Sequence, residues 1–317
     1  MPLIASAYKA PIYLFNPHLE TVIPSVFRKV PGTYHRERLE LPDGDFVDLD
    51  WMTEQRDKLV IISHGLEGNS ERHYTKGMAV HFFQHGWDSL AWNCRGCSGE
   101  VNRLPRFYHH GATEDLAAVI EHALQKNYLH IVLIGFSMGG SMTLKYLGER
   151  IARKEIKAAV TFSVPCDLGS SAAELDKPDN KFYRNRFLKK LAKKIQVKAA
   201  QFPNLLSAAG FETITTFREF DTRYTAPLHG FNDANDFYTR ASCGSYLENI
   251  QIPTLLVNAE NDPFLPDACY PIELARNQPY LHLEIPKRGG HVGFSLRSSK
   301  INWMEKRAFE FVVQNHQ

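Results

Sequence analysis

The sequence predicts an α/β protein with a mostly parallel sheet that is flanked by helices. Two observations support this fold class. Short apolar runs typical of buried strands alternate with helical patterns along most of the 317 residues, and such alternation favours parallel βαβ units with right-handed crossovers. In addition, a glycine-flanked serine at position 137 stands between an apolar run and a helical pattern. The length is sufficient for one large domain with an insertion.

The first part of the chain supplies the opening elements. Residues 1–34 are rich in proline and aromatic residues, and we expect them to form an ordered arm because their apolar side chains need burial. Two strands are expected around the turn Pro42-Asp-Gly44. The elements that follow are a strand at 58–64, a helix at 70–85, a strand at 87–92 and a helix at 112–125.

The segment from 131 to 140, Ile-Val-Leu-Ile-Gly-Phe-Ser-Met-Gly-Gly, is the most informative. Its four apolar residues indicate a buried strand, and a helical pattern follows it. A sharp strand-to-helix turn strains its central residue and leaves space only for small neighbours, which explains the glycines. Such a turn would lift Ser137 above the sheet at the positive end of a helix. The segment predicts a nucleophilic serine, with a structural tight turn as the alternative.

The alternation continues after this serine and then stops. A strand is expected at 158–164, whereas residues 167–245 contain helical patterns without a clear buried strand. Strands at 252–258 and 281–285 and helices at 267–277 and 303–313 then resume the pattern. We therefore expect a core made of residues 1–166 and 246–317. We expect 167–245 to be a helical cap, or lid, over the end of the sheet where α/β proteins bind ligands.

A nucleophilic serine needs a base and an acid that orients the base. In folds with this turn the chain order is serine, acid, histidine. His291, in the glycine-rich loop Arg288-Gly-Gly-His, follows a predicted strand and is the expected base. Asp262, at an Asp-Pro step after another strand, is the expected acid, and Glu260 is the alternative.

The negative charge that develops on an attacked carbonyl oxygen needs two N–H donors. One is expected from Met138, directly after the serine. The other is expected from the loop His64-Gly-Leu-Glu-Gly, where Leu66 follows the glycine that opens the turn.

Several segments in order carry a resemblance to a known family. They are Asn16-Pro-His-Leu-Glu-Thr21, His64-Gly-Leu-Glu-Gly68, Asn93-Cys-Arg-Gly-Cys-Ser-Gly99, Gly135-Phe-Ser-Met-Gly-Gly140, Asn261-Asp-Pro263 and Gly290-His291. With them the chain resembles the α/β-hydrolase superfamily over nearly its whole length, and in particular the YheT-like subgroup of α/β-hydrolase-domain proteins. The resemblance implies an eight-stranded, mostly parallel sheet, a Ser-Asp-His triad, no cofactor and esterase or lipase-like activity.

Composition excludes some functions and partners. The net charge of +2 does not suggest a polyanionic partner, so nucleic-acid binding is not expected. The five scattered cysteines favour a reducing compartment over a disulfide framework. We identify neither a signal peptide nor an apolar run of the roughly 20 residues that span a membrane. The sequence thus predicts a soluble cytoplasmic protein.

Three motifs have a second interpretation. Cys94 and Cys97 have the spacing of a redox pair, but they lie in a turn where this fold commonly carries small residues. His110 and Asp115 match a pattern that is suggested to support acyl transfer in some related hydrolases, and Asp115 also suits a helix start. His18, His109 and His110 could bind a metal, but nothing in the sequence fixes their separation, and no metal site is expected.

The segment 183–198 places Phe187, Leu188, Leu191, Ala192 and Ile195 at helical spacing, with Lys189, Lys190, Lys193, Lys194 and Lys198 expected on the other side. Such a helix can belong to a lid with a solvated face or lie on an anionic membrane. We expect the first, without peripheral membrane contact.

The sequence as a whole predicts a serine hydrolase that cleaves small-molecule carboxylic (acyl) esters through a Ser137–His291–Asp262 triad and an acyl-enzyme intermediate. A thioesterase or acyltransferase with the same triad is the alternative among enzymes. A non-catalytic binding protein on a hydrolase fold is the alternative outside them.

Overall fold

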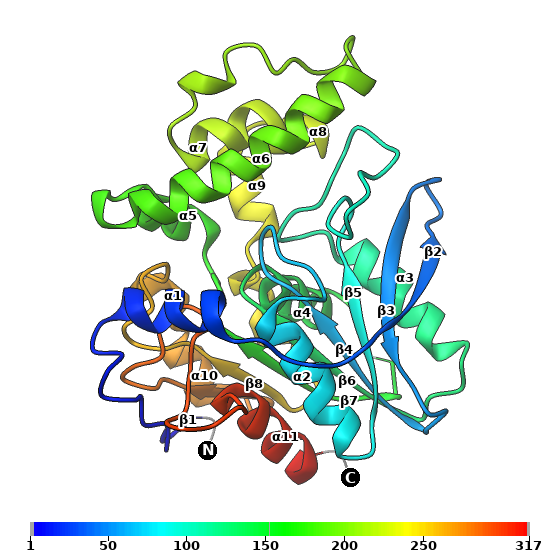
Figure 1. Cartoon of the computed structure of the whole chain (residues 1–317), viewed down its shortest axis with the longest axis vertical. Coiled ribbons are helices and arrows are strands. Elements are labelled where there is room, and N and C mark those ends of the chain that lie inside the picture. Colours follow the sequence, from blue (N-terminus) through cyan, green and yellow to red (C-terminus); the bar gives the residue numbers. More distant parts are fainter. Residues whose placement is uncertain (1–2, 152, 316–317) are drawn as a thin grey trace.

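The computed structural model describes residues 3–151 and 153–315. Its centre is one sheet with the strand order β1-β9-β8-β7-β6-β4-β5-β3-β2 (Figure 1). The pairs β2·β3 and β3·β5 are antiparallel, and every other pair in the sheet is parallel. The strands are β1 (Leu3–Ile4), β2 (His35–Glu40), β3 (Phe46–Met52), β4 (Lys58–Ser63), β5 (Asp88–Asn93), β6 (His130–Phe136), β7 (Ile156–Phe162), β8 (Thr254–Val257) and β9 (Leu281–Glu284).

The mostly parallel sheet is confirmed, but within the described residues it has nine strands and not the expected eight. The additional strand is β1, which has two residues and pairs in parallel with the edge strand β9. Two residues are too few to show a hydrophobic period, so the sequence pattern could not reveal this strand.

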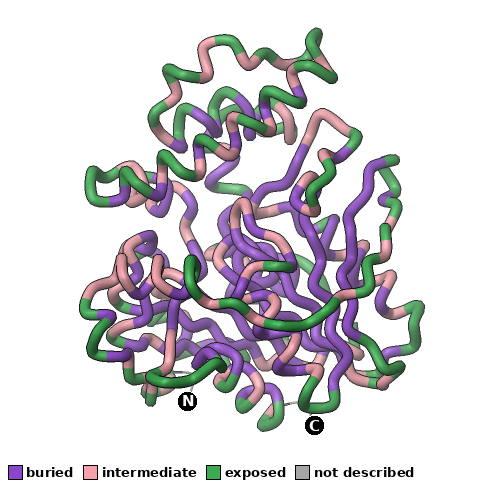
Figure 2. Tube along the Cα trace, in the orientation of Figure 1, coloured by how far each residue is buried: buried purple, intermediate pink, exposed green. Residues whose placement is uncertain are grey.

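Helices cover both faces of the sheet because the central strands are apolar on both sides (Figure 2). On β4, Leu59 and Ile61 belong to one buried cluster, together with residues of α3 (Thr113–Leu124) and α4 (Met138–Glu149). Val60 and Ile62 belong to a second cluster, together with residues of α2 (His73–Gln84) and α11 (Trp303–Asn315). Successive strand residues point to opposite faces, so a fully apolar strand needs helices on both.

Two further helices and a short 3₁₀ turn belong to this part of the molecule. Helix α1 (Pro17–Phe27) starts at Asn16, whose side chain accepts a hydrogen bond from the Leu19 N–H. Helix α10 (Ile272–Asn277) lies between β8 and β9, preceded by the turn η5 (Asp267–Cys269). In Figure 1, α1 lies beside the carboxyl-end side of the sheet, below the helices described next.

Residues 167–245 form helices and loops that lie together at one end of the sheet (Figure 1). Their elements are α5 (Leu168–Asp176), η1 (Pro178–Asn180), α6 (Lys181–Gln201), η2 (Phe211–Thr213), α7 (Phe217–Phe220), the π-helical turn η3 (Asp221–Thr225), α8 (Ala226–Leu228), α9 (Ala234–Ala241) and the first part of η4 (Gly244–Asn249). The turn η4 packs directly on α4: a Cβ on Gly148 would lie only 2.0 Å from the Tyr246 carbonyl oxygen.

Helix α6 is the longest of these. Its lysines do not all lie on a solvent-exposed side opposite the apolar residues, as the sequence had suggested. Leu188, Leu191 and Ile195 are buried. Its lysines are split, however: Lys190, Lys194 and Lys198 donate hydrogen bonds to atoms of the sheet-bearing part of the chain, whereas Lys189 and Lys193 are exposed. Residues at positions i, i+4 and i+8 lie on the same side of a helix, so these three lysines all point towards the sheet-bearing part of the chain.

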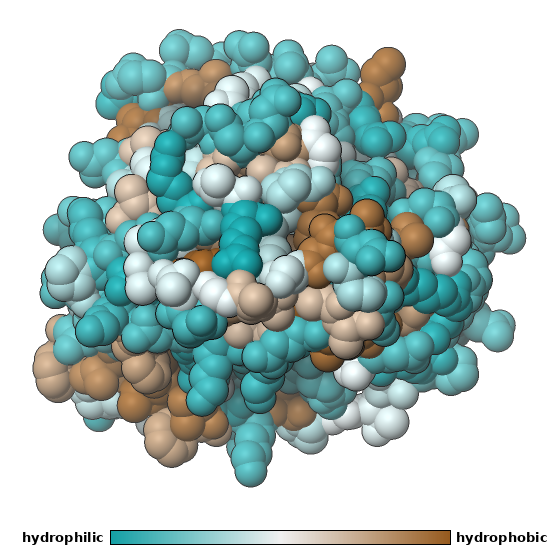
Figure 3. Space-filling view, turned by 90° about the horizontal axis from the view of Figure 1, so that it is seen from above, coloured by the Kyte–Doolittle hydropathy of each residue, from teal (hydrophilic) through white to brown (hydrophobic). Residues whose placement is uncertain are grey.

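The outer surface over these helices is largely hydrophilic when viewed from above (Figure 3). Within the described ranges, no helix combines the length and the apolar character needed to cross a membrane.

Candidate active site

Ser137 lies at the junction of β6 and α4 with φ 53° and ψ −117°. This positive φ is unfavourable for a residue with a side chain and marks local strain. The two flanking glycines have a packing reason. A Cβ on Gly135 would lie 2.5 Å from the Gly139 carbonyl oxygen, and a Cβ on Gly139 would lie 2.3 Å from the Ser63 carbonyl oxygen. No side chain fits at either position, so the sharp turn that presents Ser137 requires both glycines.

His291 lies between Ser137 and Asp262. Its Nε2 is 2.9 Å from Ser137 Oγ, and its Nδ1 is 2.9 Å from Asp262 Oδ2 and 3.1 Å from Oδ1. An ionised carboxylate only accepts hydrogen bonds, so Nδ1 carries the proton and Nε2 is free to accept one from the serine hydroxyl. Asp262 is buried and also accepts a hydrogen bond from the Phe264 N–H at 3.0 Å. The alternative acid, Glu260, is exposed and is not in contact with His291.

Helix α1 holds the loop that carries His291. The His291 N–H donates to Thr21 Oγ1 at 2.9 Å, and the Gly289 N–H donates to Glu20 Oε2 at 3.0 Å. Glu20 is buried and also accepts hydrogen bonds from Arg288 and Asn261. The side chain of Asn261 in turn accepts from the Gly290 N–H at 3.1 Å. Sequence reasoning missed this function of Glu20 and Thr21. The only signal was that the segment 16–21 is one of those that resemble the α/β-hydrolase superfamily.

The two expected N–H donors lie near the serine. Leu66 follows Gly65, where an added Cβ would lie 3.2 Å from Ser137 Cβ. The turn is fixed by His64, whose Nδ1 is 2.7 Å from the Gly65 carbonyl oxygen and whose Nε2 accepts from the Cys94 N–H. Met138 is the first residue of α4, so its N–H has no partner within that helix. Among the described residues, neither Leu66 nor Met138 donates its N–H to an acceptor.

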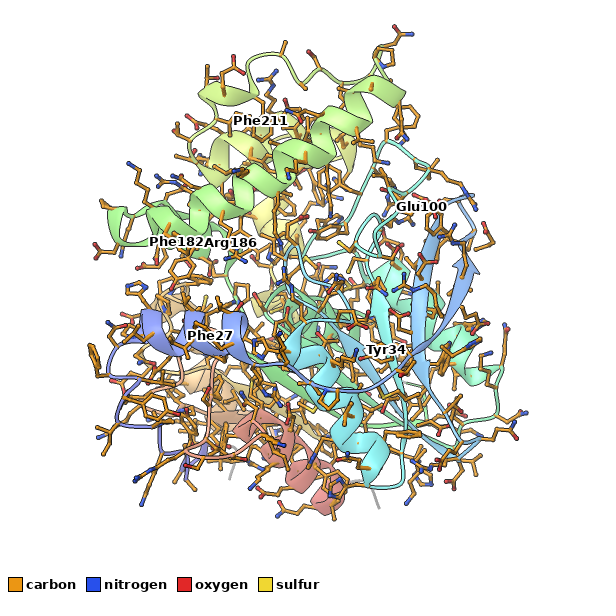
Figure 4. The ribbon with its side chains drawn as sticks, viewed as in Figure 1. Phe27, Tyr34, Glu100, Phe182, Arg186 and Phe211 are labelled. Atoms are coloured by element: carbon orange, nitrogen blue, oxygen red, sulfur yellow. The ribbon has the colours of Figure 1, made fainter. Side chains whose placement is uncertain are left out.

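A cavity of about 210 Å³ contains Ser137, His291 and Leu66 in its wall. Most of the other lining residues are apolar or aromatic, and many of these come from residues 167–245 and from the loop after β8. They include Leu168, Leu175, Phe187, Leu191, Phe217, Phe220, Phe237, Phe264 and Leu265. Phe182 and Arg186 extend from α6 on the side that faces α1 and also line the cavity (Figure 4). The cavity therefore offers an apolar chain a place next to a serine hydroxyl.

A small polar group lies in the same wall. Burial raises the pKa of Asp221 to about 7, although Thr225 Oγ1 and the Tyr238 hydroxyl both donate hydrogen bonds to its carboxyl group. Asp221 begins a π-helical turn, a feature that often marks functional sites. Sequence reasoning did not single out this residue; the available signal was its place in an aromatic-rich segment, between Phe220 and Tyr224.

The histidines considered for a metal site have different partners. His109 packs against His229 with ring centroids 4.8 Å apart, whereas His18 contacts Tyr183. No group of three His, Cys, Asp or Glu residues in the described part of the chain is suitable to hold a metal ion. Asp115 forms a buried ion pair with Arg95 at 2.6 Å.

Cys94 and Cys97 are free thiols, and burial raises the pKa of both. Thiols are less reactive when their pKa is raised, which argues against a redox function for this pair.

The comparisons with known proteins agree with this architecture. The family described as alpha/beta hydrolase fold matches residues 58–297. The chain is 35% identical to the candidate esterase YheT of Escherichia coli (strain K12), over 88% of this chain and 84% of that protein. It is 30% identical to the mouse (Mus musculus) phospholipase ABHD3, over 92% of this chain and 74% of that protein.

Among solved structures, the Pyrococcus furiosus esterase Pf2001 is similar in fold. The TM-score is 0.61 at 18% identity, over 91% of this chain and 96% of that chain. The expected resemblance to the YheT-like subgroup is thereby confirmed, and the protein belongs to the α/β-hydrolase family.

Proposed function

We propose that this protein is a serine hydrolase that cleaves carboxylic esters through an acyl-enzyme intermediate. The observation that carries the proposal is the unbroken contact from Ser137 Oγ to His291 and from His291 to Asp262. This contact lies at the wall of an apolar cavity. A hydroxyl, an imidazole and a carboxylate thus lie at the hydrogen-bonding distances that a nucleophile, a base and an orienting acid would need, which supports the proposal.

The geometry supports the following sequence of steps. Ser137 Oγ attacks the acyl carbon while His291 Nε2 takes the hydroxyl proton, and Asp262 stabilises the imidazolium that forms. The oxyanion of the tetrahedral intermediate is held by the N–H groups of Leu66 and Met138. Collapse of the intermediate breaks the C–O bond, and His291 gives its proton to the leaving alcohol. Water, deprotonated by His291, then attacks the acyl-serine and releases the carboxylic acid.

We further propose that residues 167–245 act as a lid on a core made of 1–166 and 246–317. Support comes from the cavity wall, much of which is built by α5, α6, α7 and α9. An apolar cover removes water from the serine and gives the acyl chain a surface on which to be buried.

The relatives support the reaction class. YheT is named as a candidate esterase and ABHD3 as a phospholipase, and both names refer to cleavage of esters. The five cysteines are free and buried, which is typical of a reducing compartment, so we propose a cytoplasmic location.

An activity-based probe tests the proposal directly. A fluorophosphonate should label the protein at Ser137 and should not label Ser137→Ala. A panel of p-nitrophenyl esters with acyl chains of two to sixteen carbons should then show turnover that depends on chain length. Lack of labelling, or labelling without turnover of any ester in the panel, would contradict the proposal and favour a binding protein.

A further inference from the structure

Three cationic side chains line the cavity that holds Ser137. They are Arg72, at the start of α2, and Arg186 and Lys190 on α6. These residues come from two separate parts of the chain, which meet only in the folded protein. Arg186 is exposed, and Arg72 and Lys190 are half-buried.

The positive charge of this group is not neutralised within the described residues: no carboxylate forms an ion pair with Arg72, Arg186 or Lys190. Arg72 Nη2 and Lys190 Nζ both donate to the backbone carbonyl oxygen of Glu67, at 3.0 and 3.1 Å. The carboxylate of Glu67 is already bound by Lys194 at 2.7 Å and by the Tyr108 hydroxyl at 2.5 Å.

The charges also affect each other. Burial lowers the pKa of Lys190, and the neighbouring charges of Arg72 and Arg186 lower it further, against the opposing effect of Glu67. Three like charges that only Glu67 partly offsets raise the free energy of the unliganded site, and an anion would relieve that repulsion.

The loop after β4 positions two of the three cations, Arg72 and Lys190, relative to the serine. Glu67, whose carbonyl oxygen both Arg72 and Lys190 contact, directly follows Leu66. Two of the three cations are thus held at the residue next to the proposed oxyanion donor. The apolar part of the cavity wall suits the acyl chain, so the three cations are left for the alcohol part of an ester.

We propose that Arg72, Arg186 and Lys190 bind an anionic group, a phosphate or a carboxylate, on the alcohol part of the ester substrate. This rests on the ester hydrolysis proposed above and specifies its substrate class. Guanidinium groups bind both anions through paired N–H donors, and lysine adds a point charge.

Three octanoyl esters that differ only in the alcohol test the proposal: octanoyl glycerol, octanoyl glycerol 3-phosphate and the octanoyl ester of glyceric acid. We expect kcat/KM to be higher for at least one charged ester than for the neutral one. The preferred charged ester identifies the anion as phosphate or carboxylate. The preference should decrease at high ionic strength, because salt screens exposed charges.

Variants of α6 provide the matched comparison. Arg186→Gln and Lys190→Gln should each lower the charged-to-neutral ratio of kcat/KM roughly tenfold. Lys189→Gln and Lys193→Gln change exposed lysines of the same helix and should leave the ratio unaltered. Equal turnover of all three esters by the unaltered protein, or an equal loss on all three in Arg186→Gln, would overturn the proposal.

A binding measurement separates this proposal from the hydrolase proposal. Ser137→Ala should bind octyl phosphate more tightly than octanol in a calorimetric titration, and Arg186→Gln in that background should reduce the difference. This result does not depend on turnover, so the anion site can be tested even if no ester is hydrolysed. Equal binding of octyl phosphate and octanol would contradict the anion site while leaving the hydrolase proposal in place.

Discussion

The Thr21 hydroxyl oxygen accepts a hydrogen bond from the backbone N–H of His291 at 2.9 Å, although the two residues are 270 positions apart. The same hydroxyl donates to the Pro17 carbonyl oxygen at 2.7 Å, so the contact ties the His291 loop to the first turn of α1. Next to it, Glu20 accepts hydrogen bonds from Arg288, Gly289 and Asn261. The proposed base is thus positioned by a helix near the start of the chain.

Removal of this hydroxyl should reduce turnover without removing the base. For Thr21→Val we expect kcat on a short soluble ester to fall roughly tenfold with little change in KM, because a misplaced base weakens mainly the transition state. The measurement is steady-state kinetics, with the melting temperature recorded in parallel. Thr21→Ser keeps the hydroxyl and should restore most of kcat. A fall in kcat of equal size in both variants would contradict a positioning function.

The contacts of His291 give a second prediction. Ser137→Ala and His291→Ala should each lower kcat by about three orders of magnitude or more while the fold stays intact. Asp262→Asn should also be severe, because the amide Nδ2–H can donate to His291 Nδ1, which favours the tautomer protonated at Nε2 and leaves no acceptor for the serine proton. Glu260→Gln, at an exposed position, is the matched control and should stay near the unaltered activity. A greater loss in Glu260→Gln than in Asp262→Asn would overturn the assignment of the acid.

Local patterns predicted much of this architecture. The strand, glycines and helix around Ser137 are contiguous, and their steric requirements can be read from the order of residues alone. Asp262 and His291 could be proposed as acid and base because each follows a recognisable strand, and the structure brings the two side chains into contact. Glu20 could not be found in this way, since its partners Arg288 and Asn261 lie more than two hundred residues away.

Helix α6 shows a different limit of sequence reasoning. Helical spacing placed its lysines opposite its apolar residues, which suggested one solvated basic face. In the structure, Lys194 reaches Glu67, and Lys198 donates to the Asn102 carbonyl oxygen at 2.6 Å. A single-helix pattern cannot show that the helix is covered on two sides, because the second contact surface belongs to a distant part of the chain.

Asp221 leads to a prediction about pH. Burial raises its pKa to about 7 in the folded protein, whereas an unfolded chain gives about 3.9. Between these values the folded state binds more protons than the unfolded state, so this group makes stability fall as pH rises through the interval. Above the folded pKa its effect is constant.

Asp221→Asn keeps the size of the side chain and removes the titration. The melting temperature of the variant minus that of the unaltered protein should therefore be larger at pH 8 than at pH 5. Asp236→Asn is the control at a second carboxylate. Asp236 is half-buried, and hydrogen bonds from Asn232 lower its pKa. For this variant the difference in melting temperature from the unaltered protein should not rise with pH. The prediction is wrong if the Asp221→Asn difference is the same at both pH values.

Leu191, on the buried side of α6, gives a prediction about stability and chain length. It is 3% exposed and lines the cavity. Leu191→Ala should cost about 2–5 kcal/mol of stability, because it removes buried methyl groups from a packed apolar cluster. Turnover of long-chain esters should fall more than that of a two-carbon ester, since only a long chain needs this wall. Equal losses on both esters would argue that Leu191 does not contact the acyl chain.

The exposed lysines of α6 decide whether this helix can bind an anionic membrane. A lysine near such a surface adds up to about 1 kcal/mol of attraction, and this attraction is screened by salt. Lys190, Lys194 and Lys198 are engaged with the core, which leaves only the exposed Lys189 and Lys193 among the five. The inward turn of the other three lysines removes most of the basic face that such binding would need. In a sedimentation assay with phosphatidylserine vesicles we therefore expect negligible salt-sensitive binding, with no difference between the unaltered protein and the double variant Lys189→Gln/Lys193→Gln. Tight binding that is lost both in salt and in this double variant would show that α6 faces lipid, and would move the substrate towards esters in a membrane.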